Sequence, residues 1–115
     1  TVKSYTPKIY KKLMTTQEAS KLTELMTGVV ESGTGSALSG RGYTAAGKTG
    51  TAEIKASKED TSGTELGWFA IYTAEKDIEC PILIISMVED VKGRGGSGYV
   101  VKKDSLVLEE WFGDN

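Results

Sequence analysis

Residues 66–88 read LGWFAIYTAEKDIECPILIISMV and decide the fold, because they hold two apolar runs separated by a turn. The runs, Leu66–Thr73 and Ile82–Val88, are rich in β-branched and aromatic residues, which favour strands. Asp77 and Pro81 in the segment between them are typical of a turn. We therefore expect an antiparallel hairpin. Both runs are apolar at consecutive positions, which indicates a sheet that is covered on both faces.

A third strand is expected upstream, over Tyr43–Ile54. Its β-branched residues, among them Thr49 and Thr51, favour a strand, whereas Gly47 and Gly50 weaken it. A glycine inside a strand often marks the close approach of a ligand or of another backbone. This strand is therefore a candidate for a binding role.

Helices are expected on both sides of the strands. Thr15 and Glu18 fit a capping box at the start of a helix over residues 16–31, and Gly33 lies where a left-handed C-cap belongs. A second helix is expected over residues 99–112. The first helix carries one apolar stripe that should cover a core: Ala19, Leu22, Met26, Val29 and Val30.

The order helix, strand, strand, strand, helix predicts an α+β fold. A three-stranded antiparallel sheet would be flanked by an N-terminal and a C-terminal helix, within a single partial domain over residues 1–115. Two helices cover one face of such a sheet. Either a partner or a part of the protein outside this chain covers the second face, or the apolar pattern overstates how far that face is covered. The aromatic residues expected in the core are Trp68, Phe69, Tyr72, Trp111 and Phe112.

The composition excludes several kinds of chemistry. The chain has no His and one Cys (Cys80), which removes Ser-His-Asp triads, His-liganded zinc and intrachain disulfides. With 14 Lys and Arg against 16 Asp and Glu, the net charge of −2 gives no electrostatic case for nucleic acid. The longest apolar stretch, residues 81–88, is far shorter than a membrane helix. We expect no metal, no cofactor and no nucleic-acid partner.

Residues 42–49 (GYTAAGKT) match GxxxxGK[ST], the phosphate-binding P-loop. That motif works where a buried strand precedes the loop and a helix follows it, so that the helix N-terminus cradles the phosphates. Here Ser39–Arg41 precede the motif, and Gly50–Ile54 after it favour a strand. A nucleotide binder using Gly42–Thr49 therefore stays only as an alternative.

The same lysine belongs to a second motif, Lys48-Thr49-Gly50-Thr51, that suits the binding of an acyl donor at a sheet edge. Gly50 removes a side chain where a substrate backbone must lie close to the strand. Lys48 offers a positive charge, and Thr49 and Thr51 offer hydroxyls, to a carboxylate. The Thr51 N–H is a candidate oxyanion donor, which makes Thr51 the candidate catalytic residue of this chain. The sequence Lys-Thr-Gly is short and occurs by chance in many proteins, so it does not by itself identify a function.

The surrounding sequence resembles the transpeptidase domain of penicillin-binding proteins. Residues 15–53, TTQEASKLTELMTGVVESGTGSALSGRGYTAAGKTGTAE, resemble the helix, Gly-Thr-Gly loop and KTG strand of that family. The segments GWFAIY (67–72), ILIISMVED (82–90) and GGSGYVV (95–101) resemble its next two strands and the loop before its C-terminal helix. The resemblance runs from Thr15 to Phe112 in the family's order.

The resemblance implies an α/β/α, β-lactamase-like fold with a five-stranded antiparallel sheet and Lys48–Thr51 on its active-site edge. It also implies a D,D-transpeptidase that cross-links peptidoglycan, in which a serine attacks the stem peptide at D-Ala-D-Ala and the acyl group passes to an amine. The implied ligands are the stem peptide and β-lactams. The implied location is the extracytoplasmic face of the bacterial cell membrane, with the anchor outside this chain.

Two motifs of the family are missing. No Ser is followed by Lys at the third position, as SxxK requires, and the only Asn, Asn115, forms no SxN. The chain therefore resembles the C-terminal portion of a transpeptidase domain, without the nucleophilic serine. The N-terminal part of the domain is the expected partner, because it would cover the second sheet face and pair with strand 82–88. We expect that the isolated chain is not acylated and that it self-associates. A non-catalytic interaction module is the other alternative.

Overall fold

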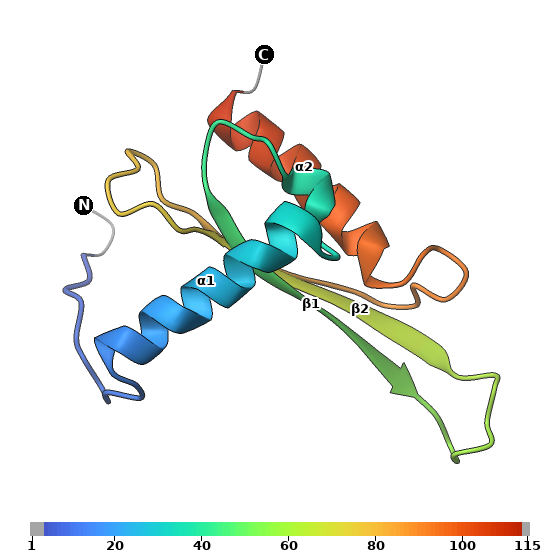
Figure 1. The fold of residues 1–115 in the computed structure, drawn as a ribbon. Helices are drawn as coiled ribbons and strands as arrows, with labels where there is room; N and C mark the ends of the chain where they lie inside the picture. Colours follow the sequence, from blue (N-terminus) through green and yellow to red (C-terminus); the bar gives the residue numbers. More distant parts are fainter. Residues whose placement is uncertain (1–3, 114–115) are drawn as a thin grey trace.

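The structure is a computed structural model that describes residues 4–113. Two helices flank three strands along the chain, and a short 3₁₀ helix, η1, follows the first helix (Figure 1). This order confirms the predicted α+β class. The elements are α1 (Thr16–Ser32), η1 (Ser36–Leu38), β1 (Ala45–Ile54), β2 (Thr64–Thr73), β3 (Leu83–Val88) and α2 (Ser97–Phe112).

The three strands form one antiparallel sheet in the order β1-β2-β3. The predicted hairpin is therefore confirmed, with Ala70 of β2 opposite Ile85 of β3. On its other side β2 pairs with β1, where Ala70 lies opposite Lys48 and Gly67 lies opposite Thr51. Among the described residues, β1 and β3 are thus the two edges of the sheet.

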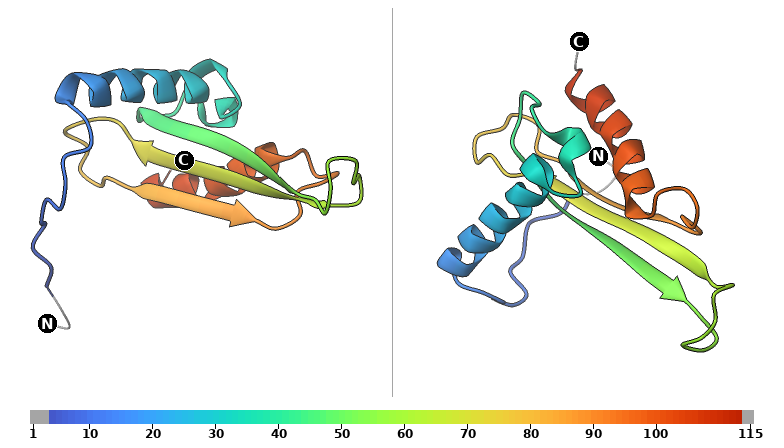
Figure 2. Two further views of the ribbon diagram at one scale, coloured as in Figure 1. Left: turned by 90° about the horizontal axis from the view of Figure 1, so that it is seen from below. Right: turned by 45° about the vertical axis from the view of Figure 1, so that its right-hand side comes forward.

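One face of the sheet is buried beneath α2 (Figure 2). Phe69 and Ile71 of β2 are 0% and 1% exposed and belong to one apolar cluster with residues of α2. A Cβ at Gly67 would lie 2.7 Å from the Val91 side chain and 2.9 Å from that of Val100, so a larger residue there would separate the sheet from α2. The buried members of the cluster are Val30, Leu38, Tyr43, Ala45, Phe69, Ile71, Val91, Val100, Val101 and Leu108.

Helix α1 lies beside β1 and reaches the core only near its C-terminal end (Figure 2). Its capping box is confirmed, because the Glu18 N–H donates to Thr15 Oγ1 and the Thr15 N–H donates to the Glu18 carboxylate. The predicted apolar stripe is only partly confirmed, since Val30 is buried and Leu22 is exposed. The predicted left-handed cap at Gly33 is wrong: its φ of −105° is extended backbone, and its N–H donates to the Val29 carbonyl.

The second face of the sheet is open at β2 and β3 among the described residues, which agrees with the expectation that the two helices cover one face only. Trp68 is 41% exposed, and Ile85 is 65% exposed. The register places both on the face opposite Phe69, because side chains alternate along a strand. Trp111 is also exposed, so placing Trp68 and Trp111 in the core was wrong, whereas Phe69 is fully buried. Leu83 and Met87 of β3 share the open face and are exposed as well.

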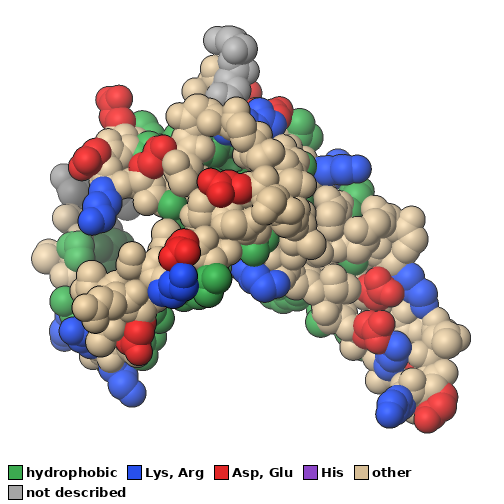
Figure 3. Space-filling model, in the orientation of Figure 1, with side chains coloured by type: hydrophobic (Ala, Val, Ile, Leu, Met, Phe, Trp, Pro, Cys, Tyr) green, Lys and Arg blue, Asp and Glu red, His purple; other side chains and the backbone are tan. Residues whose placement is uncertain are grey.

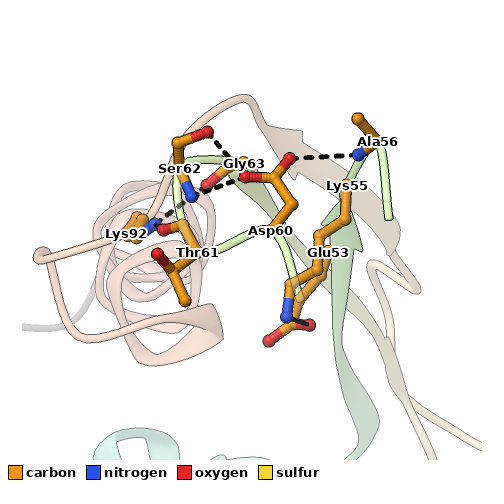
Figure 4. A network of polar contacts seen from close by, with 8 residues as sticks. All are labelled: Glu53, Lys55, Ala56, Asp60, Thr61, Ser62, Gly63 and Lys92. Carbon is orange, nitrogen blue, oxygen red and sulfur yellow. Dashed lines mark hydrogen bonds and ion pairs between the residues drawn. The ribbon is translucent and has the colours of Figure 1, made fainter. Parts of the chain in front are cut away.

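The loop between β1 and β2 is fastened to the segment that leads into α2 (Figure 4). The Lys92 ammonium donates to the carbonyls of Thr61 and Gly63. Within the loop, Asp60 accepts hydrogen bonds from the backbone N–H groups of Ala56 and Ser62 and from the Ser62 hydroxyl. These bonds lower the pKa of the Asp60 carboxyl to about 2, so the carboxylate that accepts them stays ionised above about pH 2.

Candidate functional site

The four residues Lys48–Thr51 lie in the middle of β1, an edge strand. This placement contradicts the alternative that residues 42–49 form a P-loop. Lys48 continues a strand that runs to Ile54, no helix follows it, and the sheet is antiparallel. The phosphate-binding geometry needs a helix N-terminus directly after the lysine. Residues 42–49 therefore do not form a nucleotide site.

The backbone of β1 alternates between groups bonded to β2 and groups that point away from it. The Ala74 N–H donates to the Thr44 carbonyl at 2.9 Å, in the same register as the β1–β2 pairing. Bonded pairs then recur at every second residue of an antiparallel ladder. Even-numbered residues of β1 therefore bond to β2, whereas the N–H and C=O groups of Thr49 and Thr51 point toward the free edge.

Lys48 projects from the face of the sheet that carries Trp68, because Lys48 and Gly50 alternate with the two threonines. Its ammonium donates to the Thr49 carbonyl at 2.7 Å, one of the groups at the free edge. The lysine is exposed. A positive charge thus lies directly at the edge of β1. Figure 3 shows that charges of both signs gather farther along the same strands, at the β1–β2 loop.

Thr49 projects toward the opposite face and is only 8% exposed. Its hydroxyl oxygen lies 2.8 Å from the hydroxyl oxygen of Thr34, in the loop after α1. Thr34 belongs to the candidate site through this contact, and the sequence did not predict it. The available signal was its place between Gly33 and Gly35, because a Cβ at those glycines would lie 2.9 Å and 3.2 Å from the Val29 carbonyl oxygen. Only glycine lets the loop turn this tightly against α1.

The two glycines of β1 have different surroundings. A Cβ at Gly47 would lie 3.0 Å from both the Ala70 carbonyl oxygen and the Phe69 ring, so this glycine lets two strands and a core aromatic pack closely. A Cβ at Gly50 would meet only the Cβ of Trp68, at an ordinary 3.6 Å. A methyl group at position 47 would therefore press on its neighbours, whereas position 50 leaves room for one.

Thr51 is exposed and faces the loop before α2. A Cβ at Gly96, the N-cap residue of α2, would lie 3.9 Å from the Thr51 hydroxyl oxygen. Gly93, Gly95 and Gly96 all have positive φ angles, which favour glycine. These glycines thus form the tight turn that starts α2 beside β1.

Other reactive groups lie away from Lys48–Thr51. Asp104 of α2 is 3% exposed, and one of its oxygens accepts a hydrogen bond of 2.7 Å from the Ser86 hydroxyl of β3. Burial raises the pKa of the Asp104 carboxyl, against the smaller lowering effect of that bond. Within residues 4–113, no group of three or more metal-binding side chains comes together, and no helix has the length and apolar character to span a bilayer.

Comparison with known proteins identifies the family. The sequence model described as "Penicillin binding protein transpeptidase domain" matches residues 2–105. Penicillin-binding protein 3 of Bacillus subtilis (strain 168) is 47% identical over 97 residues. That match covers 82% of this chain and 14% of the relative, so the chain spans a small part of the relative's length. With its two helices, its antiparallel sheet and these matches, the chain belongs to the penicillin-binding protein transpeptidase domain family.

Proposed function

We propose that this chain is the KTG-bearing portion of a serine D,D-transpeptidase that cross-links peptidoglycan at the extracytoplasmic face of the bacterial cell membrane. The observation that supports it most directly is the outward orientation of the Thr49 and Thr51 backbone groups on an edge strand. An extended substrate peptide can add to such an edge through main-chain hydrogen bonds. The Lys48 ammonium at the same edge adds the charge that a carboxylate needs.

Each of the four residues has a separate task in this proposal. Lys48 attracts the carboxylate of the stem peptide or of a β-lactam, and the hydroxyls of Thr49 and Thr51 bind it. Gly50 leaves space for the substrate backbone, since the fold itself does not need a glycine there. The Thr51 N–H donates to the oxyanion that forms when the acyl group is attacked.

The nucleophile comes from outside the chain in this proposal, because no SxxK motif is present. The surface that the rest of the domain would cover is the open face of β2 and β3. At the β3 edge, the Thr73 N–H donates to the Ile82 carbonyl, so the backbone groups of Leu83, Ile85 and Met87 point away from β2. The same three side chains are exposed. Both the free edge and the apolar face therefore suit the N-terminal part of the same domain.

The proposal is tested with a fluorescent penicillin. The 115-residue chain alone should take up no covalent label. The complete protein that contains this chain should be labelled stoichiometrically. In the complete protein, Lys48→Ala should slow acylation about 10- to 100-fold, the effect of losing a hydrogen bond to a charged group. Lys76→Ala removes a lysine from the β2–β3 loop and should leave the rate unchanged.

Three results would contradict the proposal. Stable labelling of the isolated chain would show that the nucleophile lies within it. Failure of the complete protein to react would favour the non-catalytic interaction module. An unchanged acylation rate in Lys48→Ala would remove Lys48 from the site.

A further inference from the structure

The hydroxyl pair between Thr34 and Thr49 joins two segments that are 15 positions apart in the sequence, at an oxygen–oxygen distance of 2.8 Å. Thr49 is nearly buried within β1, whereas Thr34 is exposed on the loop after α1. We propose that Thr34 is a positioning residue, which orients the Thr49 hydroxyl toward the carboxylate of the substrate. This inference rests on the function proposed above and adds a residue to the same site.

The direction of the hydrogen bond decides what Thr49 can do. A hydroxyl has one proton to donate and two lone pairs that accept. If Thr49 donates to Thr34, its single proton is occupied, and only lone pairs face an incoming carboxylate. If Thr34 donates to Thr49, the Thr49 proton is free to donate to the carboxylate. An anionic ligand selects the second arrangement, in which the two hydroxyls form a chain that ends on the ligand and in which each bond polarises the next.

The loop holds Thr34 in place before any ligand binds. The N–H groups of Gly33 and Gly35 both donate to the Val29 carbonyl, at 3.1 and 3.0 Å. The Cβ positions of both glycines lie close to the same carbonyl, so neither accepts a larger residue without a shift of the loop. Thr34 is therefore fixed between two anchored residues. A hydroxyl that is already held in place loses less conformational entropy when the ligand binds than a mobile one does.

The test compares hydroxyl deletions in the complete protein, with acylation by a carboxylate-bearing β-lactam and by its methyl ester as the two readouts. Thr34→Val removes the hydroxyl and keeps the shape, and should slow acylation by the carboxylate about fivefold, the effect of one neutral hydrogen bond. The methyl ester should react at a nearly unchanged rate, because it has no anion for Thr49 to bind. Thr34→Ser keeps the hydroxyl and should restore the rate.

Two controls separate positioning from a general loss of structure. Thr27→Val deletes a hydroxyl that donates to the Thr23 carbonyl within α1, and should change neither rate. In a double-mutant cycle, Thr34→Val should have no further effect once Thr49→Val is present, because Thr34 acts through Thr49. The cycle stays informative even where the single variants lose some stability.

Several outcomes would overturn the inference. An unchanged carboxylate rate in Thr34→Val, an equal loss with the ester, a failure of Thr34→Ser to restore the rate, or additive effects in the cycle would each do so. Failure of the proposed function is recognised separately, because the unsubstituted protein would then not react or Lys48→Ala would have no effect. A reactive protein with a Lys48 effect and no Thr34 effect refutes this inference alone.

Discussion

Gly47 and Gly50 lie three positions apart on β1, and the structure assigns them different reasons for being glycine. At position 47 a methyl group would press on the Ala70 carbonyl and the Phe69 ring, both 3.0 Å away. At position 50 it would make an ordinary contact of 3.6 Å with Trp68. Packing therefore explains the first glycine. The second leaves space for the backbone of the substrate that we propose.

The comparison of Gly47→Ala with Gly50→Ala tests this difference. Gly47→Ala should lower the free energy of unfolding by about 1–3 kcal/mol, the usual cost of overpacking. Gly50→Ala should change it by less than about 0.5 kcal/mol, because its methyl group has room. Chemical denaturation of the chain followed by Trp fluorescence measures both.

Acylation of the complete protein supplies the other half of the comparison. Gly50→Ala should slow its reaction with penicillin although the variant folds, because the methyl group stands where the substrate backbone would lie. Equal stability losses in the two variants, or an unchanged acylation rate in Gly50→Ala, would contradict this interpretation.

At the level of single residues, the sequence predicted what neighbouring positions determine and missed what the fold brings together. The strand predicted over Tyr43–Ile54 is present, and its alternation places Thr49 and Thr51 on one face and Lys48 on the other. Thr34 was missed because its contact with Thr49 depends on how the loop after α1 turns. The regular spacings of helices and strands do not predict which residues a loop brings into contact.

Between elements, Asp104 and Ser86 form the polar contact that joins α2 to β3. One Asp104 oxygen is bonded to Ser86, and the other is buried without a hydrogen-bond partner among the described residues. A buried carboxylate with an unsatisfied oxygen destabilises the fold, and this is the cause of its raised pKa. Burial thus makes the charged form of this carboxyl less favourable in the folded protein than in the unfolded chain.

This raised pKa makes the stability of the chain depend on pH. The folded protein holds the Asp104 proton more tightly than the unfolded chain, so the contribution is complete below the ordinary pKa of 3.8 and is lost as pH rises through the raised value. Asp104→Asn cannot ionise and keeps an oxygen for Ser86. It should therefore be more stable than the unsubstituted chain near pH 7 and should lose this advantage near pH 3.

Denaturation with urea at several pH values measures this difference. Asp77→Asn, in the exposed β2–β3 loop, is the matched control and should show no such trend. An effect of Asp104→Asn on stability that stays constant from pH 3 to pH 7 would show that folding does not raise the pKa of this carboxyl.

The bounds of the elements were predicted to within about two residues, because their signals are local. The capping box that starts α1 spans four positions, and both of its hydrogen bonds are present. The C-terminal end of α1 was predicted less well. A glycine after a helix suggested a left-handed cap, but Gly33 instead keeps extended backbone angles as the chain turns back against Val29.

At the scale of the whole molecule, the open sheet face is the feature that local pattern could not resolve. Consecutive apolar residues predicted cover on both faces, the two helices were expected to supply it on one, and the described chain covers one. Trp68 and Ile85 read as core residues because a sequence shows how apolar a strand is and not which element lies over it. The prediction of a missing partner, made from the same pattern, is consistent with a chain that spans 14% of its relative.

The isolated chain should self-associate through this open face and the β3 edge. An exposed apolar strand with free backbone groups is a template for pairing with a second copy. Ile85→Lys places a charge in the middle of the patch, where Ile85 is 65% exposed, and should shift the chain toward monomer. Sedimentation velocity over a range of concentrations measures the shift.

Ile9→Lys introduces the same charge in the N-terminal segment, outside the sheet, and should leave the association unchanged. A chain that is monomeric at every concentration, or an equal effect of the two substitutions, would contradict association through the β3 edge.

The sequential strand order β1-β2-β3 also has a kinetic consequence. Each strand pairs with its neighbour in the chain, and each connection, residues 55–63 and 74–82, is nine residues long. Short connections keep contact order low, and hairpins of this kind form in about 1–10 μs. The sheet can therefore assemble without waiting for a distant segment, so that the strand carrying Lys48 is already in register when the remainder of a longer polypeptide docks against it.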